Sequence, residues 1–73
     1  MIEIGIMGAG SIAIKMANTV NEMKSANLYG VASRDIAKAQ KFADTYHIEH
    51  AYGSYKDMAQ DPAIDLVYVA TPH

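Results

Sequence analysis

Apolar and polar positions along the chain follow two alternating patterns. Continuous apolar runs rich in β-branched residues are typical of buried parallel strands. Between these runs, apolar residues recur at the spacing of one helix face. The predicted elements, in chain order, are strands over 2–7, 28–33, 48–52 and 66–70, and helices over 11–24, over 36–46 and after Ser54. Strands that alternate with helices in this way predict an α/β fold built on a parallel sheet.

A glycine turn joins the first predicted strand to the first helix. Its pattern is Gly8-x-Gly10-x-x-Ala13, the arrangement with which a βαβ unit binds a dinucleotide. Gly8 permits a sharp turn with positive φ, Gly10 lets a pyrophosphate approach the backbone, and Ala13 lets the helix lie close to the strand. The N–H groups near Ser11 and Ile12 would then face the phosphates, whose charge the helix dipole favours. The alternative is a turn whose glycines serve packing alone.

The end of the second predicted strand bears on the choice of cofactor. An acid at this place binds the ribose 2′-hydroxyl of NAD, whereas a nearby Arg accommodates the 2′-phosphate of NADP. Here Ser33 stands where the acid is expected, and Arg34 follows it. A hydroxyl and a guanidinium both donate hydrogen bonds to phosphate. We therefore predict NADP in preference to NAD, with a solvated loop cation as the alternative role of Arg34.

Two residues after Arg34 are predicted to have structural roles. Asp35 is expected to cap the helix that begins at Ile36, because Asp is a favoured N-cap residue. Lys38 lies in the first turn of that helix. It could be a second phosphate contact, but an exposed helix lysine is the preferred interpretation.

Composition excludes several classes of function. With 73 residues the chain forms one domain at most, and its 51% hydrophobic content is typical of a globular α/β domain. A net charge of −2 without a basic stripe argues against nucleic acid. No apolar run approaches the roughly 18 residues that span a bilayer, and the absence of cysteine fits a cytoplasmic protein. His47 and His50 are not expected to bind metal, since no cysteine or carboxylate cluster joins them to complete a ligand set.

Four blocks of the chain resemble the N-terminal part of the glucose–fructose oxidoreductase / inositol dehydrogenase (Gfo/Idh/MocA) family. They are residues 4–13, 31–35, 52–55 and 65–73. The expected fold is the first half of a Rossmann doubly wound parallel sheet with strand order 3-2-1-4, so that 1–73 is a partial NAD(P)-binding domain. By resemblance, Gly8, Ala9, Gly10, Ser11 and Ile12 would hold the pyrophosphate, Ser33 and Arg34 the ribose and its 2′-phosphate, and Ala70, Thr71, Pro72 and His73 the nicotinamide side.

The resemblance also implies what this sequence lacks. Relatives continue with a strand that carries a Glu-Lys-Pro motif, whose Lys assists proton transfer, and with a larger domain that binds a sugar or polyol. We therefore expect the cofactor-binding portion of an oxidoreductase that transfers hydride to or from a sugar-like hydroxyl, without the substrate domain and not catalytic alone.

Alternatives and partners complete the sequence expectations. One alternative is a stand-alone, non-catalytic nucleotide-binding or interaction module. A glycine loop for S-adenosylmethionine is less favoured, because Ser33 replaces the acid that would bind its ribose. The fourth strand is expected to be an open, apolar edge and to pair with a second copy or a partner.

Overall fold

A computed structural model describes residues 1–70 of the chain. The predictions for Thr71, Pro72 and His73 lie outside the described residues. The elements are β1 (Ile2–Met7), α1 (Ser11–Glu22), β2 (Ala26–Ala32), α2 (Ile36–Tyr46), β3 (His50–Tyr52), α3 (Tyr55–Ala59) and β4 (Leu66–Val69). All seven predicted elements are therefore present, with boundaries that shift by a few residues.

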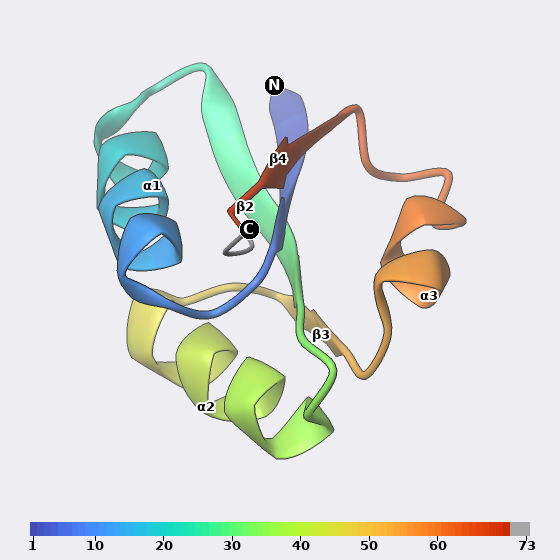
Figure 1. The fold of residues 1–73 in the computed structure, drawn as a ribbon. Coiled ribbons are helices and arrows are strands. Elements are labelled where there is room, and N and C mark those ends of the chain that lie inside the picture. Colours follow the sequence, from blue (N-terminus) through green and yellow to red (C-terminus); the bar gives the residue numbers. More distant parts are fainter. Residues whose placement is uncertain (71–73) are drawn as a thin grey trace.

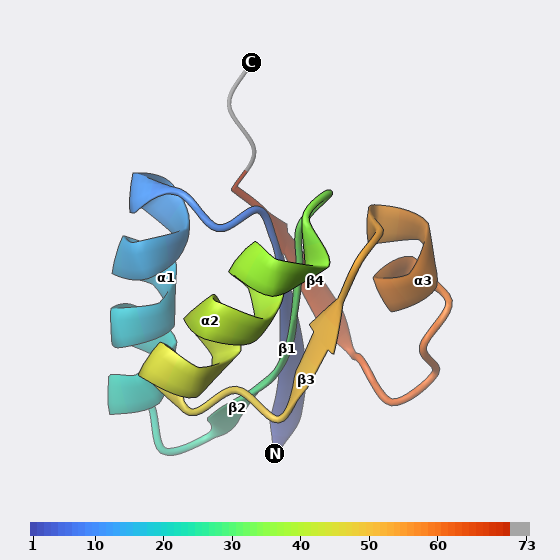
Figure 2. The same cartoon turned by 90° about the horizontal axis from the view of Figure 1, so that it is seen from below.

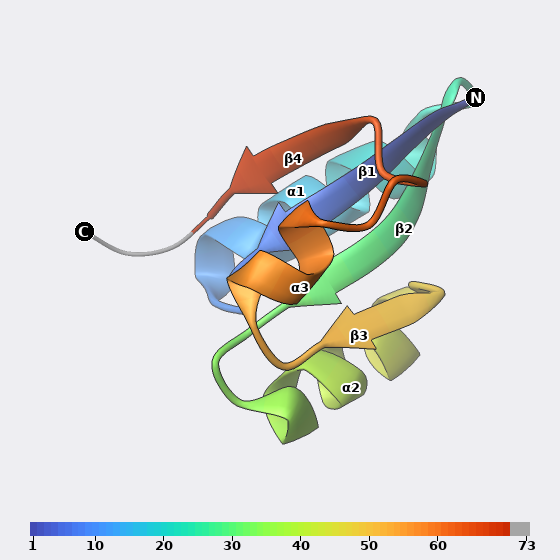
Figure 3. The same cartoon turned by 90° about the vertical axis from the view of Figure 1, so that its right-hand side faces the viewer.

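The strands form one parallel sheet in the order β3-β2-β1-β4, which confirms the predicted half of a Rossmann sheet. Helices α1 and α2 cover one face of this sheet, and α3 lies on the other (Figures 1, 2 and 3). The change of face follows from the right-handed crossover rule, because the connection from β3 to β4 runs back across the sheet. The carboxyl ends of β1 and β4 therefore meet at the point where the strand order reverses, which is where such sheets bind ligands.

Helix α1 approaches the sheet closely because its buried face is made of small residues. Ala13 and Ala17 are completely buried, and Val20 is nearly so. They pack with Ile6 and Leu28 of the central strands in one core cluster. The prediction that Ala13 permits close packing of α1 on the sheet agrees with this burial.

Two apolar positions expected to be buried are exposed instead. The side chain of Ile12 is 55% exposed, and that of Ile36 is 44% exposed. Each lies in the first turn of its helix. Ile12 faces a groove beside β4, and Ile36 lies over Gly53 in the loop after β3. Phe42, predicted at the edge of its helix face, is buried.

A hydrogen-bonded aromatic ring fixes the segment that leads into β4. The ring of Tyr52 covers Gly30 so closely that a Cβ at Gly30 would lie 2.6 Å from Tyr52 Cε1. The Tyr52 hydroxyl donates to Asp61, and the other carboxylate oxygen of Asp61 accepts from the Ala63 N–H. The hydrogen bonds from Tyr52 and Ala63 lower the pKa of Asp61. Burial and the hydrogen bond to Asp61 raise the pKa of Tyr52. The loop between α3 and β4 is thereby tied to β3.

Candidate functional site: the carboxyl edge of the sheet

Gly8 ends β1 and turns the chain toward α1. Its φ is 106°, in the region that favours glycine, which confirms the conformational prediction for this residue. The buried Gly8 N–H donates to the Ala32 carbonyl at 2.7 Å, so the turn remains attached to β2. The backbone conformation at position 8 therefore requires glycine.

Gly10 has a different explanation. It is the N-cap of α1 with φ −93° and ψ −164°, an extended conformation that any residue adopts. A Cβ placed on Gly10 would meet no atom of the described residues within 4 Å. Neither backbone conformation nor protein packing therefore requires glycine here, and the space above the residue is open.

No side chain caps the N–H groups in the first turn of α1. Gly10 offers no side chain, and the first turn contains no acidic residue. Ser11 and Ile12 are both exposed. Unsatisfied N–H groups and the positive end of the helix dipole together favour an anion at this position.

The end of β2 places a hydroxyl and a guanidinium beside this turn. The Ser33 N–H donates to the Tyr52 carbonyl at 3.1 Å, and its Oγ accepts from the Asp35 N–H at 3.3 Å. Ser33 is 9% exposed, and within residues 1–70 its hydroxyl is found only as an acceptor. Arg34 is exposed and makes no ion pair within residues 1–70.

The carboxylate nearest to Arg34 along the chain is committed to the helix. Asp35 Oδ1 accepts from the Ala37 N–H at 2.9 Å, which confirms Asp35 as the N-cap of α2. One oxygen of this exposed carboxylate therefore serves the helix terminus.

A hollow of about 300 Å³ brings α2 together with the glycine turn. It is lined by Ala9, Lys38, Lys41, Phe42, Thr45 and Tyr46. Lys38 is exposed, as predicted, yet it shares this hollow with Ala9. Lys41 is not among the residues predicted from the sequence, although its spacing of three residues from Lys38 places both on one helix face. Two cations thus stand beside the expected phosphate site.

Ala70 is the described part of the predicted nicotinamide side. It is 4% exposed, and its N–H donates to the Met7 carbonyl at 2.8 Å. This bond sets the carboxyl end of β4 beside the glycine turn. No contact from Ala70 to a ligand follows from its burial alone.

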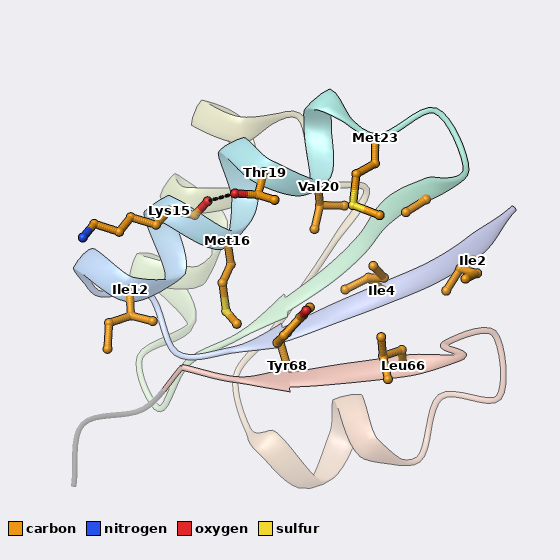
Figure 4. A pocket seen from close by; sticks show the side chains of 11 residues that line it. Ile2, Ile4, Ile12, Lys15, Met16, Thr19, Val20, Met23, Leu66 and Tyr68 are labelled. Atoms are coloured by element: carbon orange, nitrogen blue, oxygen red, sulfur yellow. Dashed lines mark hydrogen bonds between the residues drawn. The ribbon is translucent and has the colours of Figure 1, made fainter.

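A second, apolar hollow of about 360 Å³ lies between α1 and β4 (Figure 4). Ile4 lines it from β1 and Met16 from α1, and Leu66 and Tyr68 point into it from β4. Polar groups are few in this groove, since the Thr19 hydroxyl donates to a carbonyl of its own helix. Its apolar lining does not suit a dinucleotide phosphate.

Few side chains at the carboxyl edge of the sheet could serve as a general acid, a general base or a metal ligand. The two histidines within residues 1–70, His47 and His50, precede or begin β3 and so lie toward the opposite end of the sheet. The same residues contain no cluster of three metal-ligating side chains. No helix in this part of the chain has the length and apolar character to cross a membrane.

Known proteins are similar to this chain in sequence and in fold. A family profile described as "Oxidoreductase family, NAD-binding Rossmann fold" (GFO_IDH_MocA) matches residues 2–73. Trans-1,2-dihydrobenzene-1,2-diol dehydrogenase of Mus musculus is 38% identical over 71 residues, which are 94% of this chain and 21% of the relative. The chain thus spans about a fifth of the length of that relative.

Two solved structures carry ligands. A scyllo-inositol dehydrogenase from Lactobacillus casei with bound NAD(H) and scyllo-inositol superposes with a TM-score of 0.86 at 26% identity, over 99% of this chain and 22% of its own. A 3-ketoreductase from Actinomadura kijaniata in complex with TDP-benzene and NADP gives 0.88 at 25% identity, over 97% and 23%. The profile match over nearly the whole chain and the shared fold establish that this chain belongs to the Gfo/Idh/MocA oxidoreductase family and represents its NAD-binding Rossmann domain.

Proposed function

We propose that the chain is the NADP-binding part of an oxidoreductase that moves hydride between the nicotinamide and a hydroxyl-bearing carbon of a ring compound. The observation that carries this proposal is the open, uncapped start of α1 at Gly10, directly beside the carboxyl ends of β1 and β4. Main-chain N–H groups that no side chain satisfies would bind the pyrophosphate, and the open space would admit it.

The choice of NADP is supported by the groups around the end of β2. Ser33 and Arg34 supply donors where an NAD site has an acid. Lys38 and Lys41 add positive charge along the adjoining hollow. Asp35 is engaged in capping α2, so its carboxylate is turned to a backbone N–H rather than toward a phosphate. Solved structures of similar fold hold NAD(H) in one case and NADP in another.

The substrate class is proposed from the names of relatives. They refer to a dihydrobenzenediol and to an inositol, both of which are six-membered carbon rings that carry adjacent hydroxyl groups. We propose a ring compound with neighbouring hydroxyl groups for the oxidoreductase. Hydride transfer requires such a ring to be oriented against the nicotinamide in a pocket that excludes water.

Residues 1–70 supply the cofactor site and no general acid or base at its edge. The chain alone is therefore proposed to bind NADP without turnover. The alternative of a non-catalytic nucleotide-binding module predicts the same binding. The two are distinguished by the reading frame beyond His73, where a Glu-Lys-Pro block would favour the oxidoreductase.

Calorimetric titration with NADPH and NADH tests the proposal. The chain is expected to bind NADPH more tightly than NADH. Arg34→Ala should weaken NADPH binding by about 1–3 kcal/mol, because a charge-assisted hydrogen bond is lost, and should leave NADH binding nearly unchanged. Lys56→Ala on α3 removes the same charge from the other face of the sheet and is the matched control.

Different failures have different meanings. Equal binding of both cofactors would remove the role given to Ser33 and Arg34 but leave a dinucleotide site. No binding of either cofactor by a folded chain would overturn the proposed function itself.

A further inference from the structure

Two lysines of α2 carry positive charges that no carboxylate within residues 1–70 balances. Lys38 and Lys41 are exposed, and neither makes an ion pair in this part of the chain. The acids that flank the pair in sequence have other positions, since Asp35 caps the helix and Asp44 lines a different hollow beside β3. The charge of the pair is therefore available to a ligand.

The positions of both lysines are unfavourable for the helix itself. Lys38 lies in the first turn, at the positive end of the helix dipole, where acidic side chains stabilise a helix and basic ones do not. Lys41 follows three residues later, and like charges at this spacing repel each other on one helix face. The first turn contains no acidic residue that would offset either effect. Charges placed against local stability, without compensation inside the fold, are expected at functional sites.

The hollow beside the glycine turn gives the two lysines a common target. Lys38 and Lys41 line it from α2, and Ala9 lines it from the turn between β1 and α1. Phe42 and Tyr46, whose ring centroids are 4.6 Å apart, also line this space of about 300 Å³. No acidic residue of the described chain is among the lining residues. Two cations without a competing carboxylate suit an anionic group.

The path of a dinucleotide across this fold indicates which anion that is. The pyrophosphate lies at the start of the first helix, and the adenosine ribose lies between the glycine turn and the end of the second strand. Here β2 ends at Ala32 and α2 begins at Ile36. Helix α2 lies on the same face of the sheet as α1 (Figure 2). The hollow therefore adjoins the ribose position, where the extra phosphate of NADP is the 2′-phosphate.

The groups at the end of β2 do not balance the charge of this phosphate. A phosphate monoester carries about −1.5 to −2 charges at neutral pH. Ser33 is neutral and 9% exposed, and its hydroxyl accepts from the Asp35 N–H. Arg34 supplies a single positive charge. Further cations are needed, and those of α2 are the ones that share a hollow with the glycine turn.

We propose that Lys41 is a specificity-determining residue, which together with Lys38 binds the 2′-phosphate of NADP from the α2 side of the hollow. The assignment rests on the proposed function, because it names residues that recognise the additional phosphate of the cofactor. A phosphate near both lysines would also relieve their mutual repulsion, so the cost that the free helix bears is recovered on binding.

Calorimetric titration of Lys41→Gln with NADPH and NADH tests this role. The affinity for NADPH should fall about 5-fold, the upper range for an exposed ion pair, and the affinity for NADH should not change. Lys38→Gln should have at least as large an effect, because Lys38 is nearer to the end of β2 in the chain. Lys24→Gln, in the exposed turn before β2, removes the same charge at the opposite edge of the sheet and is the matched control.

Thermal unfolding without ligand gives a second measurement. Lys41→Gln should not lower the melting temperature, because the substitution removes a repulsion. NADPH should raise the melting temperature of the wild-type chain more than that of Lys41→Gln, since stabilisation by a ligand follows its affinity. A lower melting temperature of the free variant would give Lys41 a structural role and overturn the assignment.

The possible failures separate this assignment from the proposed function. Loss of NADPH affinity in Arg34→Ala, together with wild-type binding by both lysine variants, would overturn the role of the lysines and leave the NADP site in place. Lysine variants that lose NADH as strongly as NADPH would also overturn that role, because the lysines would not distinguish the 2′-phosphate. Equal binding of the two cofactors by the wild-type chain, or no binding, would overturn the NADP site together with the assignment.

Discussion

The turns that lead into α1 and α2 start from neighbouring strands, at the same edge of the sheet and on the same face, yet they end differently. The turn into α2 is complete in itself, because Asp35 caps the helix and Ser33 supports Asp35. The turn into α1 has no side-chain cap and an open space over Gly10. The difference shows how one fold can make one helix terminus stable by itself and leave its neighbour for a ligand.

In the proposed site, the two turns would consequently contact a dinucleotide with different groups. At α1 the main chain is available, so the contact is suited to a pyrophosphate of any dinucleotide. At α2 the Asp35 carboxylate accepts from the Ala37 N–H, and the exposed side chains of Arg34 and Lys38 would contact the ligand instead. Side chains can distinguish a 2′-phosphate from a 2′-hydroxyl, whereas the backbone amides at α1 face the same pyrophosphate in either cofactor.

The largest effect is expected from giving α1 the cap that α2 already has. Gly10→Asp should cap the free N–H groups and place a negative charge where the pyrophosphate would lie. NADPH binding should fall more than about 100-fold, or about 2.7 kcal/mol, while the free energy of unfolding changes by only a few tenths of a kcal/mol. Calorimetry and urea denaturation measure the two quantities.

Gly8→Ala is the control for this variant. Because Gly8 has a φ of 106°, alanine there should cost about 1–3 kcal/mol of folding stability. Unimpaired binding by Gly10→Asp would show that the α1 terminus is not the phosphate site.

A smaller effect is expected from removing the cap of α2. Asp35→Ala should lower the free energy of unfolding by about 1 kcal/mol, the usual value of an N-cap. NADPH affinity should be unchanged or slightly higher, because a carboxylate near the proposed phosphate site is lost. Denaturant titration measures the stability. Asp35→Asn keeps an acceptor and should retain it, and a large loss of NADPH binding in Asp35→Ala would mean that Asp35 belongs to the ligand site.

The smallest effect is expected from Asp61, which lies away from both turns. Its pKa is lowered by the hydrogen bonds from Tyr52 and Ala63, so its contribution to stability is present above the ordinary pKa of 3.8 and is lost as the pH falls below that value. Asp61→Asn should flatten the acid limb of a plot of stability against pH. Tyr52→Phe removes one of the same bonds and should act in the same direction. A change in cofactor preference at neutral pH would show that the two turns are not independent of this loop.

Periodicity was sufficient for most of the fold. The predicted range of α2 agrees with the observed Ile36–Tyr46, the cap at Asp35 is confirmed, and α3 begins after Ser54 as predicted. These features depend on local chemistry, namely helical spacing and short polar side chains that accept from nearby N–H groups. The positive φ of Gly8 is local in the same sense.

Burial in the first helical turns was not predictable in this way. Ile12 and Ile36 fit the apolar stripes of their helices, but Ile12 lies at the open groove beside β4 and Ile36 lies over the loop at Gly53, so both are exposed. The hollow that joins Lys38 to Ala9 also escapes a pattern analysis, since these residues are far apart in the chain and meet only when α2 packs beside the glycine turn.

The sequence by itself determined the order of elements, the glycine turn and the helix caps, because each depends on residues within a few positions of one another. Only the tertiary structure decided that Gly10 has open space above it and that Lys38 and Lys41 share a hollow with Ala9. These properties depend on which elements lie side by side, and that arrangement is set by the packing of the whole sheet.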